Sequence, residues 1–419
     1  MSRPLPAAPD YASAHLRHVL PSACSALGLD GSDPGRTGAA PGGFGNRLGL
    51  PEASIAVVLM VDGLGDEQLA RHTGHARFLA SRWRKPSTGR TLDAGVPSTT
   101  AASLASLGTG LVPGEHGLTG YNVYAPELGR VVNMLGGWDP EVEPRSWQPH
   151  EPLLSRAERA GAEVVTVSRP QFEDSKLTEA ALSGGGFLGA KRMDARFRLA
   201  EDWIAGRRPR KGQVRRGAPT PLLVYLYVDE LDKTGHKHGV DSAEWIRMLE
   251  MLDAEAERFC TGLRTLYGDQ ALVLLTADHG MVDVAAEDRL DLSALDGLQK
   301  ERLLGGVRHF AGEPRFLHLH AEEGRAEDTR SAWQETYGEL AWVLTRQEAL
   351  GAGWFGPVAE RVLPRIGDVL VAVHGPVAFF HTEQSGPGPL AMVGQHGSLT
   401  DAERKIPLLS LSGQEIGGA

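Results

Sequence analysis

Carboxylate and imidazole side chains stand at four separated places in this sequence, each directly after an apolar run or inside a glycine-flanked turn. These residues are Asp62, the pair Asp232 and His236, the pair Asp278 and His279, and His396. Three carboxylates and three imidazoles without a thiolate suit zinc; manganese and iron are less suitable, and so many histidines disfavour magnesium. Six ligands make two sets of three that leave positions open for substrate oxygens. Such two-metal sites clamp the attacking and leaving oxygens of an in-line phosphoryl displacement.

Each of these places also has a purely structural explanation. An aspartate after a strand, such as Asp62, often caps the next helix. The Asp-x-x-x-His spacing of residues 232–236 occurs by chance in many sequences, and His396 alone is typical of a loop histidine. The adjacent Asp278 and His279 are less usual, because two potential ligands side by side after a buried strand have little packing purpose. The prediction of a metal site therefore depends on the four places together.

A hydroxyl nucleophile is offered by the stretch Val96–Gly110, VPSTTAASLASLGTG. Three consecutive hydroxyls follow Pro97, at residues 98–100, and small residues then run at helical spacing to Gly108 and Gly110. Proline before Ser or Thr predicts a helix N-terminus, and the glycines predict its C-terminal end. The unpaired N–H groups and the positive dipole end of such a helix suit a phosphate. A structural helix cap is the alternative, because Ser and Thr are common capping residues.

Three uninterrupted apolar runs predict the strands that position these residues: Ile55–Val61, Leu222–Val228 and Ala271–Thr276. An acidic residue stands at the C-terminal end of each run, and helical segments alternate with the runs, including Asp66–Trp83 and Ser242–Leu266. Continuous apolar runs are typical of strands buried on both faces of a parallel sheet. The pattern predicts a doubly wound α/β fold, in which a mostly parallel sheet is flanked by helices and ligands gather at the carboxyl edge.

The segments around this core are predicted from the same kinds of pattern. Residues 1–50 should contain a helix over Tyr11–Leu27 and a Gly/Pro-rich flexible lead-in. Residues 51–419 should form one catalytic domain with cap insertions at about 111–220 and 281–390. The composition of Gly117–Arg145 favours a long irregular loop. Further expected elements are helices over Pro152–Ala160, Ala190–Ala205 and near Thr329–Leu340, and strands over Glu163–Ser168, Arg315–His320, Ala341–Thr345, Asp368–Val373 and Ile406–Leu411.

Length and composition restrict the class of protein. The chain has 419 residues, of which 41% are hydrophobic and 23% charged, as is ordinary for a soluble globular protein with a sizeable core. Its net charge of −10 argues against nucleic acid or an anionic membrane as the main partner. The basic stretch 206–220 carries no interleaved aromatic residues, so it is more typical of an exposed charged loop than of a nucleic-acid patch.

Cysteine usage and the N-terminal sequence bear on the compartment. Two distant cysteines, Cys24 and Cys260, imply no disulfide framework and match no metal-ligand spacing. Asp10, His15 and Arg17 stand where a signal peptide needs an unbroken apolar run. No stretch reaches the roughly 18–20 apolar residues of a transmembrane helix. We therefore expect a cytoplasmic protein without a transmembrane segment, whereas the oligomeric state has no signal in the sequence.

Five sequence blocks, taken in order, resemble the alkaline phosphatase superfamily, and most of all its nucleotide pyrophosphatase/phosphodiesterase family. They are VVLMVDGLG, VPSTTAASLASLGTGLVPGEHGLTGY, YLYVDELDKTGHKHG, LLTADHGM and GQHGS. The blocks span roughly residues 55–410, and their joint occurrence is specific although no single block is. The resemblance implies an alkaline phosphatase-like core. It also implies a zinc-dependent hydrolase of phosphodiester or pyrophosphate bonds that acts through a phospho-threonine intermediate.

The resemblance also assigns roles to individual residues. It implies that one zinc ion is surrounded by Asp62, Thr100, Asp278 and His279, and that a second is bound by Asp232, His236 and His396. Thr100 would be the nucleophile, from its spacing to Pro97 and Gly110, with Thr99 as the competitor. Ser103 stands three residues after Thr100, where the family often has an asparagine that donates to a phosphate oxygen. A serine there would still donate one hydrogen bond, but its shorter reach bears on rate and on the preference for diesters over monoesters.

Other activities remain as alternatives. A phosphomonoesterase usually holds the terminal phosphate charges with Arg or Lys, which the blocks around Thr100 lack, and phosphonate hydrolases use similar blocks. Neither cysteine stands in the C/S-x-P-x-R setting of a sulfatase, and a non-catalytic metal-binding module would lack a ligand or the nucleophile. We expect a small anionic phosphodiester or nucleotide-type substrate and no nucleic-acid binding. Substrate choice should lie in residues 117–145 and 281–390, where Tyr121 suits base stacking or loop packing equally.

Overall fold

A seven-stranded sheet forms the centre of the computed structural model, which describes residues 3–30, 44–207 and 219–417. The strand order is β2-β17-β8-β1-β7-β5-β6, and β17 is the one strand of this sheet that runs opposite to the other six. The strands are β1 (Ile55–Val61), β2 (Gly89–Asp93), β5 (Glu163–Ser168), β6 (Gly186–Gly189), β7 (Leu222–Val228), β8 (Ala271–Ala277) and β17 (Lys405–Ser410). Every residue of β1, β7 and β8 is buried, which is why each run is continuously apolar.

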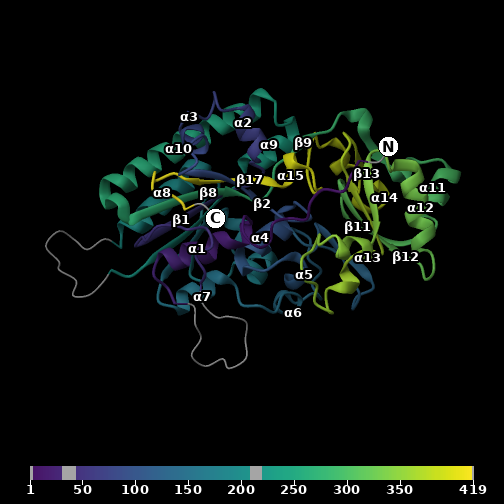
Figure 1. Ribbon diagram of the computed structural model, residues 1–419, viewed down its shortest axis with the longest axis horizontal. Coiled ribbons are helices and arrows are strands. Elements are labelled where there is room, and N and C mark those ends of the chain that lie inside the picture. Colours follow the sequence, from purple (N-terminus) through teal and green to yellow (C-terminus); the bar gives the residue numbers. More distant parts are fainter. Residues whose placement is uncertain (1–2, 31–43, 208–218, 418–419) are drawn as a thin grey trace.

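Helices cover both faces of this sheet, so the predicted doubly wound α/β fold is confirmed (Figure 1). One layer contains α2 (Asp66–Arg71), α3 (Arg77–Trp83), α8 (Met193–Ala205), α9 (Glu230–His238) and α10 (Ala243–Tyr267). The other contains α1 (Val19–Ala26), α4 (Thr100–Thr109) and α7 (Leu153–Arg159). The long helix α10 packs against α3, α8 and α9, while α1, α4 and α7 contact one another.

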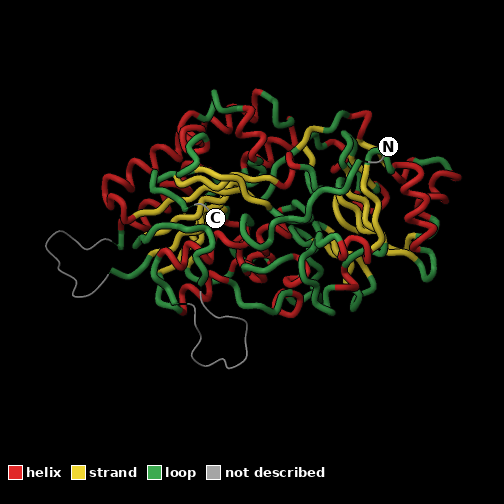
Figure 2. Tube along the Cα trace, viewed as in Figure 1, coloured by secondary structure: helices red, strands yellow, loops and turns green. Residues whose placement is uncertain are grey.

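A second, separate sheet lies beside the first, as Figure 2 shows. Its six antiparallel strands follow the order β13-β14-β12-β11-β3-β4, and helices α11, α12 and α13 accompany it. We call this sheet with its helices the second lobe. Its elements are β3 (Asn122–Ala125), β4 (Arg130–Asn133), β11 (Val307–Glu313), β12 (Phe316–Ala321), β13 (Ala341–Thr345), β14 (Val369–Val373), α11 (Gly297–Leu304), α12 (Ala326–Tyr337) and α13 (Arg346–Gly351).

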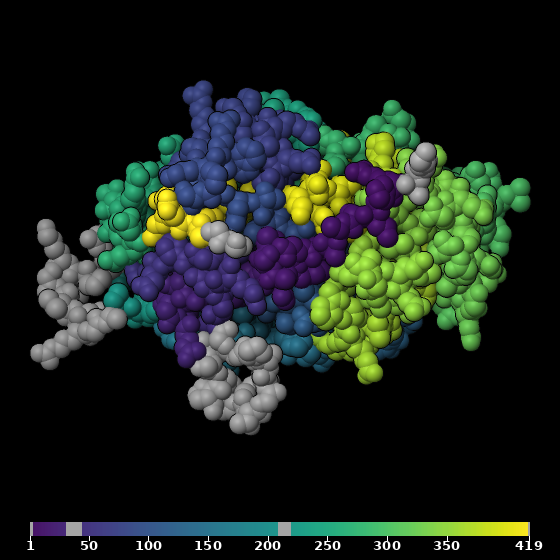
Figure 3. Space-filling model, viewed as in Figure 1, coloured from purple at the N-terminus to yellow at the C-terminus, as the bar shows by residue number. Residues whose placement is uncertain are grey.

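The N-terminal segment connects the two parts of the molecule. It runs from the first sheet across the surface of the second lobe (Figure 3). The Tyr11 hydroxyl donates to the carbonyl of Trp354 at 2.6 Å, and the Trp342 indole donates to the carbonyl of Pro4 at 3.0 Å. The remaining short elements are β9 (Val282–Asp283), β10 (Arg289–Asp291), β15 (Ala378–Phe380), β16 (Gly394–Gln395), α5 (Pro113–His116), α6 (Pro144–Trp147), α14 (Thr382–Ser385) and α15 (Asp401–Arg404).

Three predictions of local structure were wrong. The helix expected over Tyr11–Leu27 begins only with a 3₁₀ turn at Leu16, because the preceding residues are tied to the second lobe. The segment Gly117–Arg145 is not wholly irregular, since β3 and β4 lie within it and join the second lobe. The helix expected over Asp66–Trp83 is interrupted between α2 and α3, around Gly74.

Two predicted features lie outside the described residues: most of the Gly/Pro-rich lead-in, at 31–43, and most of the basic stretch, at 208–218. Within the described residues, no helix combines the length and the apolar character that crossing a membrane requires.

Candidate active site

The carboxyl ends of three adjacent strands bring most of the predicted ligands to one edge of the sheet. The order β8-β1-β7 and the pairing of Val61 with both Val228 and Ala277 make these strands end level with one another. Asp62 follows β1, Asp278 and His279 follow β8, and α9, directly after β7, carries Asp232 and His236. Gly63 has φ +75°, and a Cβ on it would lie 2.9 Å from the Cα of Asp232. Glycine therefore permits the end of β1 to approach α9 closely.

Thr100 is the first residue of α4, and its hydroxyl faces this edge. The Thr100 Oγ1 lies 3.1 Å from the His279 Nε2, which is itself 3.3 Å from Asp62 Oδ1 and 3.5 Å from Asp278 Oδ2. The predicted end of the helix is confirmed, because Gly110 with φ +74° caps it. Thr99 is the N-cap residue, but its side chain makes no capping hydrogen bond. The Thr100 hydroxyl thus lies against a buried group of metal-type ligands, Asp62, Asp278 and His279.

A second group of metal-type ligands adjoins the first. Asp232, His279 and His396 offer ligand atoms that all lie within 4.8 Å of one another, as do those of the first group. The His396 ring stacks on that of His279 with centroids 3.6 Å apart. His236 lies just outside this group, with its Nε2 3.3 Å from Asp232 Oδ1. All seven predicted residues are therefore neighbours, and His279 belongs to both groups.

The three histidines share one orientation that leaves their Nε2 atoms available. His236 Nδ1 lies 2.8 Å from the carbonyl oxygen of Gly394, His279 Nδ1 lies 3.0 Å from that of Gly280, and His396 Nδ1 lies 3.0 Å from that of Ser98. A carbonyl can only accept, so each Nδ1 carries the proton and donates it. The Nε2 of each ring is then the atom that a metal ion would bind, in place of any proton there, as is usual for ligating histidines.

The three carboxylates keep oxygens without hydrogen-bond partners among the described residues: Asp62 Oδ1, Asp232 Oδ1 and Asp278 Oδ2. Burial raises the pKa of Asp232 to about 6, and burial together with the charge of Asp62 raises the pKa of Asp278 well above its ordinary value. Burial alone would lower the pKa of His279, but the surrounding carboxylates outweigh it and raise that pKa to about 10. Buried oxygens that lack donors and a strongly negative surrounding both favour a bound cation, so the donor set fits divalent metal ions.

A tyrosine that sequence reasoning missed supports one of these ligands. The Tyr227 hydroxyl donates to the Asp62 Oδ2, and Asp62 Oδ1 stays free toward His279. Tyr227 belongs to β7, inside an apolar run, so its type and position indicated core packing. The predicted helper Ser103 is fully buried in α4, and its hydroxyl has no hydrogen-bond partner among the described residues. The role predicted for Ser103 stays a prediction.

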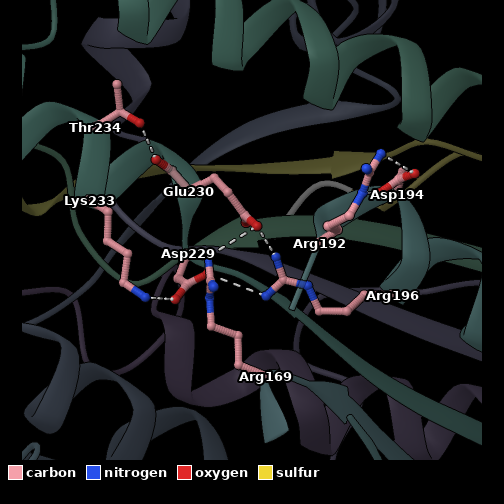
Figure 4. A network of polar contacts seen from close by, with 8 residues as sticks. All are labelled: Arg169, Arg192, Asp194, Arg196, Asp229, Glu230, Lys233 and Thr234. Carbon is pink, nitrogen blue, oxygen red and sulfur yellow. Dashed lines mark hydrogen bonds and ion pairs between the residues drawn. The ribbon is translucent and has the colours of Figure 1, made fainter. Parts of the chain in front are cut away.

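A network of charges surrounds the start of α9 (Figure 4). Arg196 from α8 is fully buried and pairs with Asp229 and Glu230, and Arg169 pairs with the same two carboxylates. Lys233 pairs with Asp229 from the next turn of α9. These contacts hold the first turn of the helix that carries Asp232.

A small, largely apolar cleft opens beside Thr100. The hydroxyls of Thr166 and Tyr225 are buried there and have no hydrogen-bond partner among the described residues. The lining residues include none that is charged; they are Thr100, Leu104, Leu135, Thr166, Ser168, Phe172, Ser175, Leu177, Thr178, Leu182, Phe187, Tyr225 and Tyr227.

The comparison with protein families agrees with this geometry. The model of the family "Type I phosphodiesterase / nucleotide pyrophosphatase" matches residues 56–399, which include every residue of the site. The chain belongs to this family. The resemblance to the nucleotide pyrophosphatase/phosphodiesterase family predicted from the five sequence blocks is thereby confirmed.

Two relatives of this chain have sequences that differ strongly from its own. Venom phosphodiesterase 2 of Crotalus adamanteus is 26% identical over 200 residues, which are 47% of this chain and 23% of the venom protein. An uncharacterised pyrophosphatase/phosphodiesterase of Schizosaccharomyces pombe is 25% identical over 333 residues, or 77% of this chain and 64% of that protein. The chain therefore matches about a quarter of the venom relative's length and about two thirds of the yeast relative's.

Solved structures of the phosphodiesterase family share the fold. Murine ectonucleotide pyrophosphatase/phosphodiesterase 5 superposes with a TM-score of 0.62 at 16% identity, covering 84% of this chain and 87% of the murine chain. An inactive variant of the murine protein, solved in complex with AMP, superposes equally well. At this identity the likeness shows the α/β fold.

Proposed function

We propose that this chain is a zinc-dependent hydrolase of phosphodiester or pyrophosphate bonds, with Thr100 as its nucleophile. The observation that carries the proposal is the position of the Thr100 Oγ1, at the N-terminus of α4 and 3.1 Å from the Nε2 of His279. A hydroxyl against metal-type ligands and beside unpaired helical N–H groups suits attack on a phosphorus atom. Membership of the phosphodiesterase family supports this reaction class.

Two zinc ions would complete the site. Asp62, Asp278 and His279 would hold one beside Thr100, and Asp232, His236 and His396 would hold the other, with the oxygens that lack donors facing them. When bound, such ions favour the alkoxide of a coordinated hydroxyl and neutralise charge on phosphoryl and leaving oxygens. The shared position of His279 between both groups supports a pair of neighbouring metal positions rather than two independent ones.

The chain's own residues account for the remaining steps. The Thr100 hydroxyl gives up its proton, and its Oγ1 forms a bond to phosphorus while the bond from phosphorus to the leaving oxygen breaks; the leaving oxygen takes up a proton, and a phospho-threonine results. Water then loses a proton as it attacks the same phosphorus, and the bond to Oγ1 breaks, so that Oγ1 takes up a proton and the threonine is restored. The N–H groups of the first turn of α4 are placed to donate to phosphoryl oxygens through both steps. Tyr227 keeps Asp62 in place throughout.

The cleft supports a diester or anhydride rather than a monoester. Its lining carries no Arg or Lys among the described residues, so nothing there would hold the second negative charge of a terminal phosphate. Its aromatic and aliphatic walls and its two unpaired hydroxyls suit an organic group attached to the phosphorus. The AMP complex of the murine neighbour agrees with a nucleotide-type substrate.

The test compares two substrates and two threonine variants. The purified chain should cleave bis-(p-nitrophenyl) phosphate faster than p-nitrophenyl phosphate, lose this activity to a chelator and regain it with zinc. Thr100→Ala should lower kcat at least about a thousandfold while the bound zinc, measured by mass spectrometry, stays unchanged. Thr99→Ala is the matched control and should retain far more activity. A fully active Thr100→Ala protein would exclude the nucleophile, and a preference for the monoester would exclude the diesterase.

A further inference from the structure

A buried carboxyl from the second lobe reaches this site without belonging to either group of metal-type ligands. Glu313 is the last residue of β11, and only 5% of it is exposed. Its Oε2 accepts the backbone N–H of Tyr121 at 2.8 Å, while its Oε1 has no hydrogen-bond partner among the described residues. The mechanism derived above gives this group no task.

Glu313 packs against the turn that carries His396. A Cβ built on Gly397 would lie 2.5 Å from the Cγ of Glu313 and 3.1 Å from its Oε1. Gly397 has φ +127°, so both its backbone conformation and the space beside it require glycine. The Glu313 side chain therefore occupies the place where any other residue at position 397 would put its own.

The same turn is joined to the turn that begins α4. The Ser98 N–H donates to the Gly397 carbonyl at 3.1 Å, and the His396 Nδ1 lies 3.0 Å from the Ser98 carbonyl oxygen. Ser98 is two residues before the proposed nucleophile. The turns that present His396 and Thr100 are thus paired through their backbones, and Glu313 meets this pair from the second lobe.

Two contacts describe what the Glu313 side chain does here. It accepts the Tyr121 N–H and it fills the space against Gly397. A glutamine has the same length, and its amide oxygen would accept the same N–H and fill the same space.

We propose that Glu313 is a positioning residue of this active site, which fixes the His396 turn against the Thr100 turn through its hydrogen bond to Tyr121 and its packing on Gly397. The proposal rests on the metal site and the nucleophile of the proposed function. It gives the second lobe a direct role in positioning the residues of the active site, in addition to the role in substrate choice expected from its sequence.

The test measures zinc affinity and steady-state kinetics for Glu313→Ala, Glu313→Gln and a control, Asp368→Ala. Asp368 is a carboxylate of the same lobe that also accepts a backbone N–H, from Ala321 at 2.9 Å, and pairs with Arg346. Zinc affinity is read by titration of the metal-free chain against a chromophoric chelator, so it needs no enzymatic turnover. Circular dichroism and the Tm of each metal-free variant report folding.

In Glu313→Ala, the weaker zinc ion should bind about 10- to 100-fold less tightly, as is usual when a group that orients metal ligands is lost. Its kcat on bis-(p-nitrophenyl) phosphate should fall while KM changes little, and Glu313→Gln should restore both zinc affinity and kcat. Asp368→Ala should bind zinc like the wild type.

Three results would overturn the proposal. In the first, Glu313→Ala binds zinc and turns over like the wild type. In the second, Glu313→Gln is as impaired as Glu313→Ala, which would assign the effect to the ionisable proton. In the third, Asp368→Ala weakens zinc binding equally, which would assign it to general loosening of the lobe. If the wild type cleaves no phosphodiester, the proposed function fails, but the zinc titration still decides the role of Glu313.

Discussion

At the scale of single residues, the two tyrosines of β7 differ in what their hydroxyls do. One is hydrogen-bonded to a metal-type ligand, and the other is only buried. Tyr225 and Tyr227 point to the same side of the strand, with ring centroids 6.4 Å apart, and both line the cleft. The Tyr227 hydroxyl donates to Asp62, whereas the Tyr225 hydroxyl has no partner among the described residues. Burial and the charge of Asp62 both raise the pKa of Tyr227 far above its ordinary value, so this hydroxyl stays a donor across the physiological range.

Replacing Tyr227 with phenylalanine should therefore weaken zinc binding. The change removes the donor that orients Asp62 and leaves one more buried carboxylate oxygen without a partner, so the zinc dissociation constant should rise about tenfold or more. Tyr225→Phe, which removes an unpaired hydroxyl from the same strand, is the matched control and should leave zinc affinity unchanged. Titration of both metal-free variants with zinc decides the matter. Equal affinities for the two variants would show that the Tyr227 hydrogen bond does not support the ligand.

The residues of the site were predictable to different degrees for a physical reason. The six ligands and Thr100 stand beside glycines, prolines and strand ends, where a polar residue has few packing uses, so their types alone were informative. Tyr227 lies inside a strand and Glu313 at the end of another, 213 residues after Thr100. Nothing in the local pattern of either residue distinguishes an orienting group from core, because their partners come from distant segments.

At the scale of elements, the start of α9 depends on buried charges more than on its own sequence. The helix contains ELDKTGHKH and buries only Leu231 and Gly235, so it lacks an apolar stripe that would predict it. Instead, Asp229 and Glu230 are held by Arg169 and Arg196, as Figure 4 shows. Arg196 is fully buried, and its two partners are largely buried too. A buried group of this kind is costly to break, because the remaining charges lose their compensation.

Replacing Arg196 with methionine should lower the free energy of unfolding by about 3 kcal/mol or more, because it leaves Glu230 buried with Arg169 as its remaining partner. Arg198 lies on the same helix α8 but is exposed and pairs with Asp194 on the surface. Arg198→Met is therefore the control, with an expected change within about 0.5 kcal/mol. Urea unfolding of the metal-free variants measures both values. A loss for Arg196→Met no larger than that for the control would show that the network does not stabilise the fold.

Strands were predicted more accurately when both of their faces are buried than when only one is. The strands β1, β7 and β8 are buried on both sides, so their apolar runs were continuous and their bounds came within one residue of those expected. By contrast, β3 and β4 are four residues long and half-buried, and they join the second lobe through the pairing of β3 with β11. Whether these residues form strands depends on that distant partner, and the local sequence pattern carries no information about it.

At the scale of the whole molecule, the two sheets and the N-terminal segment bury several histidines in uncharged form. Burial lowers the pKa of His116 and of His320 to about 3 and that of His18 to about 4. These residues come from α5, from the second lobe and from the N-terminal segment, so the effect is spread over the fold. The sequence predicted an N-terminal helix and inserted segments at about 111–220 and 281–390. It did not predict that these segments enclose ionisable groups.

These histidines should make the protein lose stability in mild acid. An unfolded histidine takes up a proton near pH 6.5, whereas His320 in the folded chain does so only near pH 3. Between these values the unfolded state binds more protons, so the free energy of unfolding falls as pH falls, by up to about 1.4 kcal/mol per pH unit for each such histidine. His320→Phe, which keeps a ring against Tyr124, should reduce the slope measured between pH 6 and 4 by about that amount.

The exposed His238 serves as control, and His238→Asn should leave the slope unchanged. Urea unfolding across this pH range, with chelator present so that metal release does not contribute, gives the slopes. A slope for His320→Phe equal to that of the wild type would show that His320 does not contribute to the acid sensitivity.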